Sequence, residues 1–316
     1  MADAGLTVAI TGATGFVGRH VLRQVLAAGH QVRVLARLPR ELPPDPNLTV
    51  VQGDLDNHEA LTQLVVGAQA VIHIVGIIKE LPAQGQTFEH VHVEGTANLL
   101  AAAKRGGSVR RWIHMSALGS RPNAVSQYHQ TKWRAEEAVR NSEIEGLAWT
   151  IFRPSIIHGP DGEFMQMVKG FWCDLFPPFV PYFGAGLLGR GGAGRLQPVY
   201  IEDLARCFAA ALTLPRSERE TYPIGGPDVY TWPQLYATVK EHLSRAGVRA
   251  RNKRIMPVPA WYAKLIAGLP GVPFNRDQVI MSQEDSTCQI GKVEEHFAIK
   301  LAAFELTLAQ YADRIG

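Results

Sequence analysis

Three glycines spaced three residues apart constrain the fold of this chain more than any other feature. They are Gly12, Gly15 and Gly18, in the stretch "AITGATGFVGRHVL". An apolar, β-branched run precedes them at residues 7–10, and a run with helical spacing follows at residues 19–28. Glycines between a strand and a helix let the backbone approach a phosphate group at the positive end of the helix dipole. We therefore predict that the pyrophosphate of a dinucleotide binds here, the alternative being a purely structural turn. Further contacts in the predicted turn are Thr14, Phe16 and Val17.

The first half of the chain alternates between strand-like and helix-like segments. Further strands are predicted at residues 31–36, 48–52, 70–75, 111–115 and 149–152, and helices at 57–66, 89–105 and 126–141. The strands are nearly continuous apolar runs, as burial on both faces of a parallel sheet requires. The predicted fold class is therefore α/β, with a doubly wound parallel sheet of the Rossmann type.

The pattern changes after Pro154, where prolines and glycines become frequent. Helices are predicted at residues 201–213 and 232–246, and a strand at 221–224. We expect an NAD(P)-binding domain at residues 1–154. A smaller α/β substrate region would follow at residues 155–316, with the chain crossing back into the first domain.

Composition excludes several other classes of protein. The 316 residues carry a net charge of +3 without a long basic block, so nucleic acid is not an expected partner. The three cysteines match no C-x-x-C spacing, which favours a reducing cytoplasm and no metal site. Among the eleven histidines, His73 and His114 fall inside predicted strands and are expected in the interior. We expect neither a signal peptide nor a membrane span.

The residue after the second predicted strand indicates which dinucleotide binds. NAD sites usually place an acidic residue there for the ribose hydroxyls, whereas this chain has Arg37, with Arg40 nearby and no carboxylate before Glu41. A guanidinium can bind a 2′-phosphate that a carboxylate would repel. We therefore predict NADP(H) in preference to NAD(H). The alternative is a solvated arginine on an ordinary loop.

Two other stretches follow strands at the edge where a dinucleotide would lie. Asp54, in "GDLDN" after the third strand, can accept a hydrogen bond from the adenine amino group or help to start the next helix. Val75 and Gly76 follow the fourth strand, where a small residue lets the cofactor ribose come close. We include all three residues in the predicted cofactor site.

The predicted helix at residues 126–141 carries a candidate for proton transfer. Tyr128 and Lys132, in "SQYHQTKW", are four residues apart and share one helix face. Positive charge from Lys132 and an oxidised nicotinamide would lower the tyrosine pKa, which lies normally near 10. Ser116 follows the fifth strand, where its hydroxyl can bind a substrate carbonyl. We predict Ser116, Tyr128 and Lys132 as the catalytic residues.

Taken together, the motifs "TGATGFVG", "GDL", "HVEGTANLL", "IHMSALGS", "YHQTK" and "FRPSIIHGPDG" resemble the short-chain dehydrogenase/reductase superfamily, in its extended or atypical epimerase/dehydratase branch. The resemblance implies that Leu55 joins Asp54 on the adenine side, and that Pro154 and Ser155 lie near the nicotinamide amide. His92 stands where extended members usually have asparagine. The short interval between Ser116 and Tyr128 lacks the insertion of sugar-nucleotide epimerases.

The C-terminal half resembles the branch that includes alpha-subcomplex subunit 9 of respiratory complex I, through "LQPVYIEDLARCF" and "MPVPAWYAKLIAGLPGVPFNRDQVIM". The basic run at residues 249–254 precedes that apolar stretch, which carries Trp261 and Tyr262. Such a segment can rest on an anionic membrane surface or on a membrane complex, the alternative being a core helix beside a solvated basic run.

Two functions therefore stay open. The first is an NAD(P)H-dependent oxidoreductase acting on a small-molecule carbonyl substrate. The second is an accessory or assembly protein that binds NADPH without turnover, with respiratory-complex subunits as partners. An epimerase is disfavoured. The expected location is the cytoplasm, with a peripheral position at the inner face of a membrane as the alternative, and helix pairing around Tyr128 makes a homodimer an option.

Overall fold

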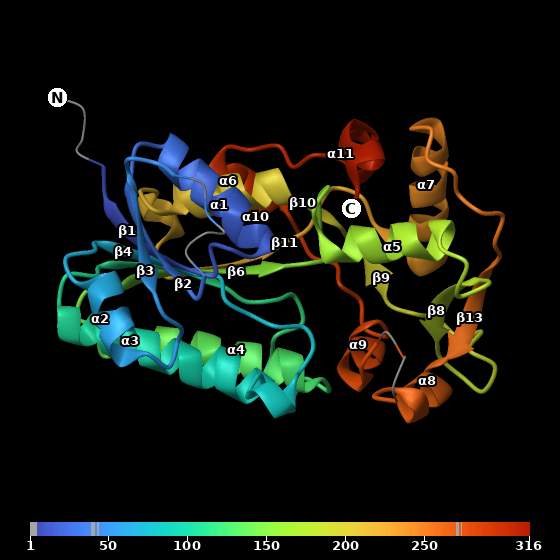
Figure 1. Cartoon of the computed structure of the whole chain (residues 1–316), viewed down its shortest axis with the longest axis horizontal. Coiled ribbons are helices and arrows are strands. Elements are labelled where there is room, and N and C mark those ends of the chain that lie inside the picture. The colour runs from blue at the N-terminus through green and yellow to red at the C-terminus, as the bar shows by residue number, and fades with distance from the viewer. Residues whose placement is uncertain (1–4, 39–41, 43, 270–271, 273) are drawn as a thin grey trace. The chain divides into compact units, whose positions relative to one another are not determined.

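The computed structural model describes residues 5–38, 42, 44–269, 272 and 274–316, so Arg40 and Glu41 lie outside the described residues. The chain divides into two compact units (Figure 1). The first runs to Arg153 and adds Glu202–Tyr222 and Glu295–Ile299. The second comprises Pro154–Ile201, Pro223–Glu294 and Lys300–Gly316.

The first unit is built on a seven-stranded sheet with the order β11-β6-β5-β4-β1-β2-β3. These strands are β1 (Thr7–Thr11), β2 (Gln31–Ala36), β3 (Leu48–Gln52), β4 (Ala70–His73), β5 (Arg111–Met115), β6 (Ala148–Pro154) and β11 (Glu220–Ile224). From β3 to β6 in this order, every neighbouring pair is parallel. The strand order reverses between β1 and β4, and a reversal of this kind marks the usual ligand crevice of a doubly wound sheet.

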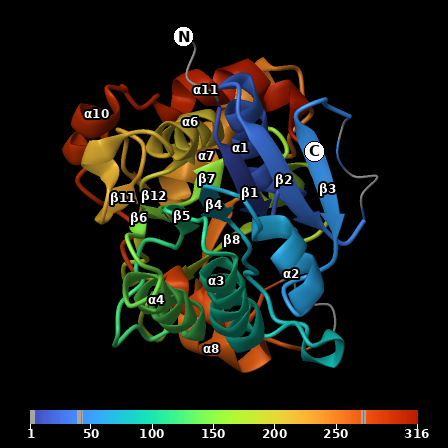
Figure 2. The ribbon, with the colours of Figure 1, turned by 90° about the vertical axis from the view of Figure 1, so that its left-hand side faces the viewer.

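Helices cover both faces of this sheet, as the apolar strands require. Figure 2 shows α2, α3 and α4 together on one face, with α1 and α6 on the other. Their bounds are α1 (Phe16–Ala27), α2 (His58–Val65), α3 (Gly95–Gly106), α4 (Gln127–Arg140) and α6 (Ile201–Ala211). Leu61, Leu99 and Trp112 are buried in the core under the first face. On the other face, Phe152 stacks on Phe208 with ring centroids 4.6 Å apart. The predicted doubly wound α/β fold is confirmed.

The second unit combines helices with three short strand pairs. Its helices are α5 (Glu163–Cys173), α7 (Trp232–Arg245), α8 (Ala260–Ile266), α9 (Arg276–Met281) and α11 (Phe304–Tyr311), while α10 (Gly291–Phe297) has residues in both units. The strand pairs are β7 (Ile157–His158) with β10 (Val199–Tyr200), β9 (Arg195–Leu196) with β12 (Tyr230–Thr231), and β8 (Val180–Gly184) with β13 (Ile255–Pro259). Trp172, Phe304 and Tyr311 belong to its core.

Several predicted elements differ from the observed ones at their ends. The helix predicted at residues 19–28 is α1, Phe16–Ala27, and the strand predicted at residues 149–152 is β6, Ala148–Pro154. Two further differences concern residues near the candidate site. The helix predicted at residues 89–105 is a π-helical segment, Glu89–Glu94, followed by α3. The strand predicted at residues 70–75 ends at His73, where its pairing with Thr11 of β1 also ends. Both differences lie beside the candidate site, and π-helical turns are frequent at such places. Among the described residues, no helix is both long enough and apolar enough to cross a membrane.

Candidate active site

Two of the three turn glycines are required by the chain itself. Gly12 follows β1 with a φ of +84°, a left-handed conformation that side chains rarely adopt. A Cβ on Gly18 would lie 1.9 Å from the carbonyl oxygen of Gly12, so any side chain there would collide with backbone. The turn is closed by the Gly15 N–H, which donates to the Gly12 carbonyl at 3.1 Å.

Gly15 has no such internal reason to be glycine. It is exposed, its φ of −76° and ψ of 173° suit any residue, and the nearest atom to an added Cβ would be 3.4 Å away. It is the N-cap residue of α1, which has no side-chain cap bond and no acidic residue in its first turn. The first N–H groups of α1, from Phe16 onward, are therefore of the kind that binds phosphate at other helix N-termini.

The turn after β1 adjoins the segment that follows β4. Thr11 pairs with His73 at the ends of the two strands, and a Cβ on Gly12 would lie 3.0 Å from the Val75 nitrogen. Gly76 is the next residue along, and it is exposed. The predicted pyrophosphate turn and the predicted ribose contacts, Val75 and Gly76, thus share the carboxyl edge of the sheet at its switch point.

Arg37 lies directly after β2 at the same edge and is exposed. No carboxylate among the described residues pairs with its guanidinium. Asp54 has a structural role, since its Oδ1 accepts the backbone N–H groups of Asp56 at 3.0 Å and Asn57 at 3.1 Å just before α2. Leu55 packs on Gly95 of α3, where a Cβ would come within 2.5 Å of its Cδ1.

Lys132 is buried on α4 and reaches the sheet edge. Its Nζ donates to the carbonyl of Met115 at 3.1 Å and to that of Val75 at 3.5 Å. A Cβ on Gly76 would lie 2.9 Å from the same Nζ, so Gly76 leaves room for the ammonium. Ser116, which follows Met115, is also buried, and its hydroxyl donates to Ser120 Oγ at 3.0 Å. The fold therefore brings Ser116, Gly76 and Lys132 to one region.

The protonation of Tyr128 differs from the sequence-based prediction. Burial raises the pKa of Tyr128 to about 12, whereas we expected Lys132 and an oxidised nicotinamide to lower it. Burial also lowers the pKa of Lys132 to about 8, against an opposing effect of Glu136. In the chain without a bound nicotinamide, the loss of water on burial is the cause of this raised pKa, and the expected lowering in the presence of the cofactor stays a prediction. Tyr128 therefore keeps its phenolic proton in the chain without cofactor.

His92 lies at the candidate site, and its contacts there could not be predicted from the sequence. It lies in the π-helical segment and is buried, and its Nε2 accepts the N–H of Ile77 at 3.1 Å. Its Nδ1 must therefore carry the proton that is shared with Thr131 Oγ1 at 2.9 Å. Its ring meets that of Tyr128 edge to face at 5.5 Å. Burial and the Lys132 charge hold the pKa of His92 well below 6.5, so a neutral ring joins the segment after β4 to α4.

Behind this edge, His73 and His114 are buried as predicted. His73 Nδ1 lies 2.6 Å from Thr11 Oγ1, and its Nε2 lies 3.0 Å from Thr96 Oγ1. Burial and, less strongly, Lys132 lower the pKa of His73 to about 3. No group of three or more histidine, cysteine or acidic side chains among the described residues could hold a metal ion.

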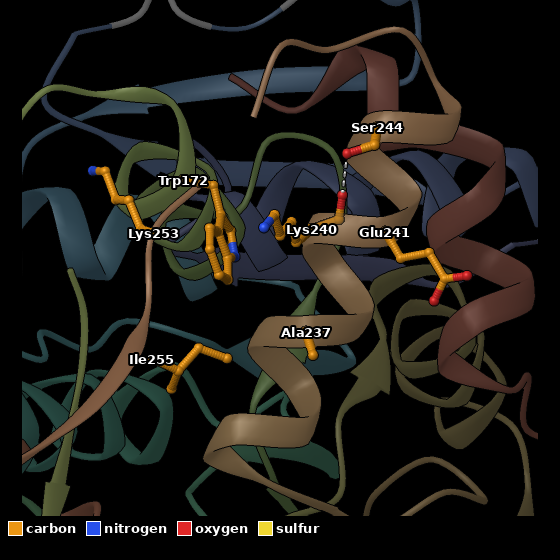
Figure 3. Close-up of a pocket in the computed structure, with 7 residues that line it drawn as sticks. All are labelled: Trp172, Ala237, Lys240, Glu241, Ser244, Lys253 and Ile255. Carbon is orange, nitrogen blue, oxygen red and sulfur yellow. Dashed lines mark hydrogen bonds between the residues drawn. The ribbon is translucent and has the colours of Figure 1, made fainter. Parts of the chain in front are cut away.

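The remaining predicted residues are Pro154 and Ser155. Pro154 ends β6, and the buried Ser155 hydroxyl bonds to the carbonyl and hydroxyl of Ser286 at 2.8 Å within the second unit. That unit also has an open pocket of about 400 Å³ over Trp172, shown in Figure 3 with Lys240 and Lys253 at its sides. None of the predicted site residues lines this pocket.

Comparison with known proteins shows the family to which the chain belongs. Residues 12–169 match a family model described as NAD(P)H-binding, and this region contains the glycine turn, Lys132 and Tyr128. The ceramide reductase of Caulobacter vibrioides is 33% identical over 236 residues, which are 74% of this chain and 69% of that protein. The chain belongs to the NAD(P)H-binding proteins of the extended short-chain dehydrogenase/reductase branch.

Other relatives of this short-chain dehydrogenase/reductase differ in their named roles. Subunit 9 of the NADH dehydrogenase alpha subcomplex from Arabidopsis thaliana is 31% identical over 243 residues, 73% of this chain and 56% of that protein. This chain thus spans little more than half of that subunit. The UDP-glucose 4-epimerase of Thermotoga maritima has a TM-score of 0.71 over 98% of both chains. At 19% identity, that likeness concerns the fold alone.

Proposed function

We propose that this chain is an NADP(H)-dependent reductase of carbonyl compounds, with Ser116, Tyr128 and Lys132 as its catalytic residues. One observation carries the proposal. The Lys132 ammonium contacts Gly76 and the Val75 carbonyl at the same sheet edge as the glycine turn, where we expect the start of α1 to bind an anion. The dinucleotide, when bound, supplies the hydride. A proton is then needed at the substrate oxygen, and Tyr128 is the nearby acid.

The roles of the three side chains follow from their surroundings. Tyr128 keeps its proton in the free chain, so it acts as the acid in reduction and gives up its proton as the carbonyl becomes an alcohol. Lys132 offers positive charge that stabilises the tyrosinate left behind, and it can donate to a ribose hydroxyl near Gly76. Ser116 would turn its hydroxyl from Ser120 to the substrate oxygen.

The preference for NADP(H) belongs to the same proposal. Arg37 is exposed after β2, and among the described residues it is paired with no carboxylate. A guanidinium at this position can make a bidentate contact with a 2′-phosphate. The adenine side would be held by Asp54, whose Oδ1 is already occupied by backbone N–H groups, together with Leu55.

One experiment tests catalysis and cofactor choice together. Wild type, Tyr128→Phe and Arg37→Ala are compared for NADPH and NADH affinity and for NADPH oxidation with aldehydes and ketones. We expect Tyr128→Phe to lower turnover about a hundredfold or more with unchanged NADPH affinity. Arg37→Ala should weaken NADPH about tenfold and leave NADH unchanged. Equal losses for both cofactors would defeat the proposed preference.

A second candidate function is supported by the relatives named as complex I subunits. In it, the chain binds NADPH without turnover, works with respiratory-complex subunits and lies at the inner face of a membrane. The same experiment separates the two functions, because wild-type protein that binds NADPH but oxidises it with no carbonyl compound would favour this second role.

A further inference from the structure

Two exposed apolar segments meet in the second unit. One is the turn after β8, which is closed by the Gly191 N–H donating to the Ala185 carbonyl at 2.8 Å. The other is α8, which follows β13. Because β8 and β13 are parallel and paired along their whole length, both segments leave the same end of the strand pair (Figure 1).

Direct contacts hold the two segments together. The Trp261 Nε1 donates to the carbonyl of Leu187 at 3.2 Å, across 74 positions in sequence. A Cβ on Gly189 would lie 2.8 Å from the Pro259 nitrogen, so the turn packs closely on the start of α8. The two segments therefore present one surface, which we call the tip surface. Its exposed apolar side chains are Leu187, Leu188, Trp261, Tyr262, Leu265 and Leu269.

The apolar residues of the tip surface are not needed for the interior. Ala260 and Ala263 form the inward side of α8 and pack with Val279 in a small buried cluster. On the outward side, Leu265 is 73% exposed and Trp261 53% exposed, while Leu187 on the turn is 78% exposed. An exposed apolar patch of this kind marks a binding surface.

Charge indicates what covers this surface. Residues 184–195 and 255–269 contain no aspartate or glutamate. Arg190 is exposed at the turn, and Lys264 lies on α8 between the apolar side chains. Leucines with tryptophan and tyrosine, in stretches whose own charged side chains are all cationic, are typical of segments that lie in the headgroup region of an anionic bilayer.

The basic run at residues 249–254 is not part of the tip surface, contrary to the arrangement expected from the sequence. Arg254 precedes β13 and α8 follows it, so the whole strand, about 16 Å long, separates them. The two stretches of the tip surface carry Arg190 and Lys264, besides Arg195, whose guanidinium pairs with Asp285 at 2.6 Å.

We propose that the tip surface inserts into the interfacial layer of a membrane that contains anionic lipid. The inference deepens the inner-face location named under the second function, but it rests on none of the cofactor-binding residues. Insertion buries leucine side chains that now face water, and the two cations bind lipid phosphates. The proposed partner is the headgroup layer of a bilayer. Binding of a protein at the same surface, in place of a bilayer, would contradict the proposal.

The test is flotation of the purified full chain with two kinds of vesicle. One contains phosphatidylcholine alone, and the other also contains phosphatidylglycerol. We expect the wild-type chain to float with the anionic vesicles. The affinity of Leu265→Glu for these vesicles should be lower by about tenfold or more. The matched control is Leu306→Glu on α11, where the leucine is 68% exposed in the same unit away from α8, and it should bind like wild type.

A second pair of measurements makes the outcome decisive. Arg190→Gln combined with Lys264→Gln should remove the preference for anionic vesicles, and every variant should keep the wild-type affinity for NADPH. Absence of wild-type flotation, or equal binding by Leu265→Glu and Leu306→Glu, would overturn the proposal. A concentration-dependent self-association that Leu265→Glu abolishes, without vesicle binding, would assign the tip surface to a protein partner instead. If the wild-type chain does not bind NADPH, that result contradicts the proposed function and leaves the membrane proposal unaffected.

Discussion

At the scale of single residues, the three turn glycines differ in what they do. Gly18 is required by close packing, because its Cβ position is occupied by the Gly12 carbonyl. Gly15 has ordinary backbone angles, and an added Cβ would meet only the Gly12 carbonyl oxygen, at 3.4 Å. A glycine that the chain does not need for its own conformation is best explained by a ligand that approaches the backbone there.

This difference predicts opposite outcomes for two matched variants. Gly18→Ala should destabilise the chain by about 1–3 kcal/mol through overpacking. Gly15→Ala should change stability by less than about 1 kcal/mol but weaken NADPH binding about tenfold, since the methyl group enters the phosphate space. Urea unfolding and fluorescence titration measure the two effects. Unchanged cofactor affinity in Gly15→Ala would contradict the assigned position of the pyrophosphate.

At the scale of elements, β4 and β5 carry neutral histidines in the interior. The rings of His73 and His114 lie 5.4 Å apart, and neither ring nitrogen of His114 has a hydrogen-bond partner in the described part of the chain. Burial lowers the pKa of both, to about 3 for His73. Below pH 6.5 an unfolded chain takes up protons at these positions and the folded chain does not, so stability falls as the pH falls.

Each such histidine should change the free energy of unfolding by about 1.4 kcal/mol per pH unit. This slope applies between the pKa of 6.5 in the unfolded chain and the lowered pKa in the folded chain. His114→Leu should remove one histidine's share of this slope, whereas the exposed His58 can be replaced by leucine with little effect on it. Urea unfolding at pH values on either side of 6.5 measures the slope. Identical slopes for wild type and His114→Leu would refute this account.

At the scale of the whole molecule, the first compact unit is assembled from three stretches of chain. Arg111 of β5 donates from Nε to the Ala211 carbonyl at 2.9 Å and from a terminal nitrogen to Ser217 Oγ at 2.7 Å. Phe152 of β6 stacks on Phe208 and Tyr222. The later stretches thus complete the core beside β6 and pair with its edge through β11.

A fragment of residues 1–154 is therefore expected not to fold by itself. It would expose Phe152, remove the hydrogen bonds of the Arg111 guanidinium to Ala211 and Ser217, and open the edge of β6. We expect no cooperative thermal transition by circular dichroism and no NADPH binding, with the full chain as the control. A fragment that binds NADPH with full affinity would show that the returning stretches are dispensable.

Local patterns in the sequence determined the nucleotide-binding half. The strands predicted at residues 31–36, 48–52 and 111–115 have the observed bounds, and the glycine turn lies between strand and helix as expected. These features can be read because burial on both faces of a sheet and left-handed backbone at Gly12 each restrict the residues nearby in sequence.

Only the tertiary structure decided what depends on neighbours far apart in the chain. The Tyr128 pKa follows from loss of water in the folded site, and the part of His92 follows from Ile77 and Thr131, which meet it only after folding. The tip surface likewise joins Leu187 to Trp261 and excludes the basic run that adjoins it in sequence. Sequence periodicity indicates which side of a helix or strand is buried. How much water a side chain keeps, and which distant residues contact it, are properties of the assembled fold.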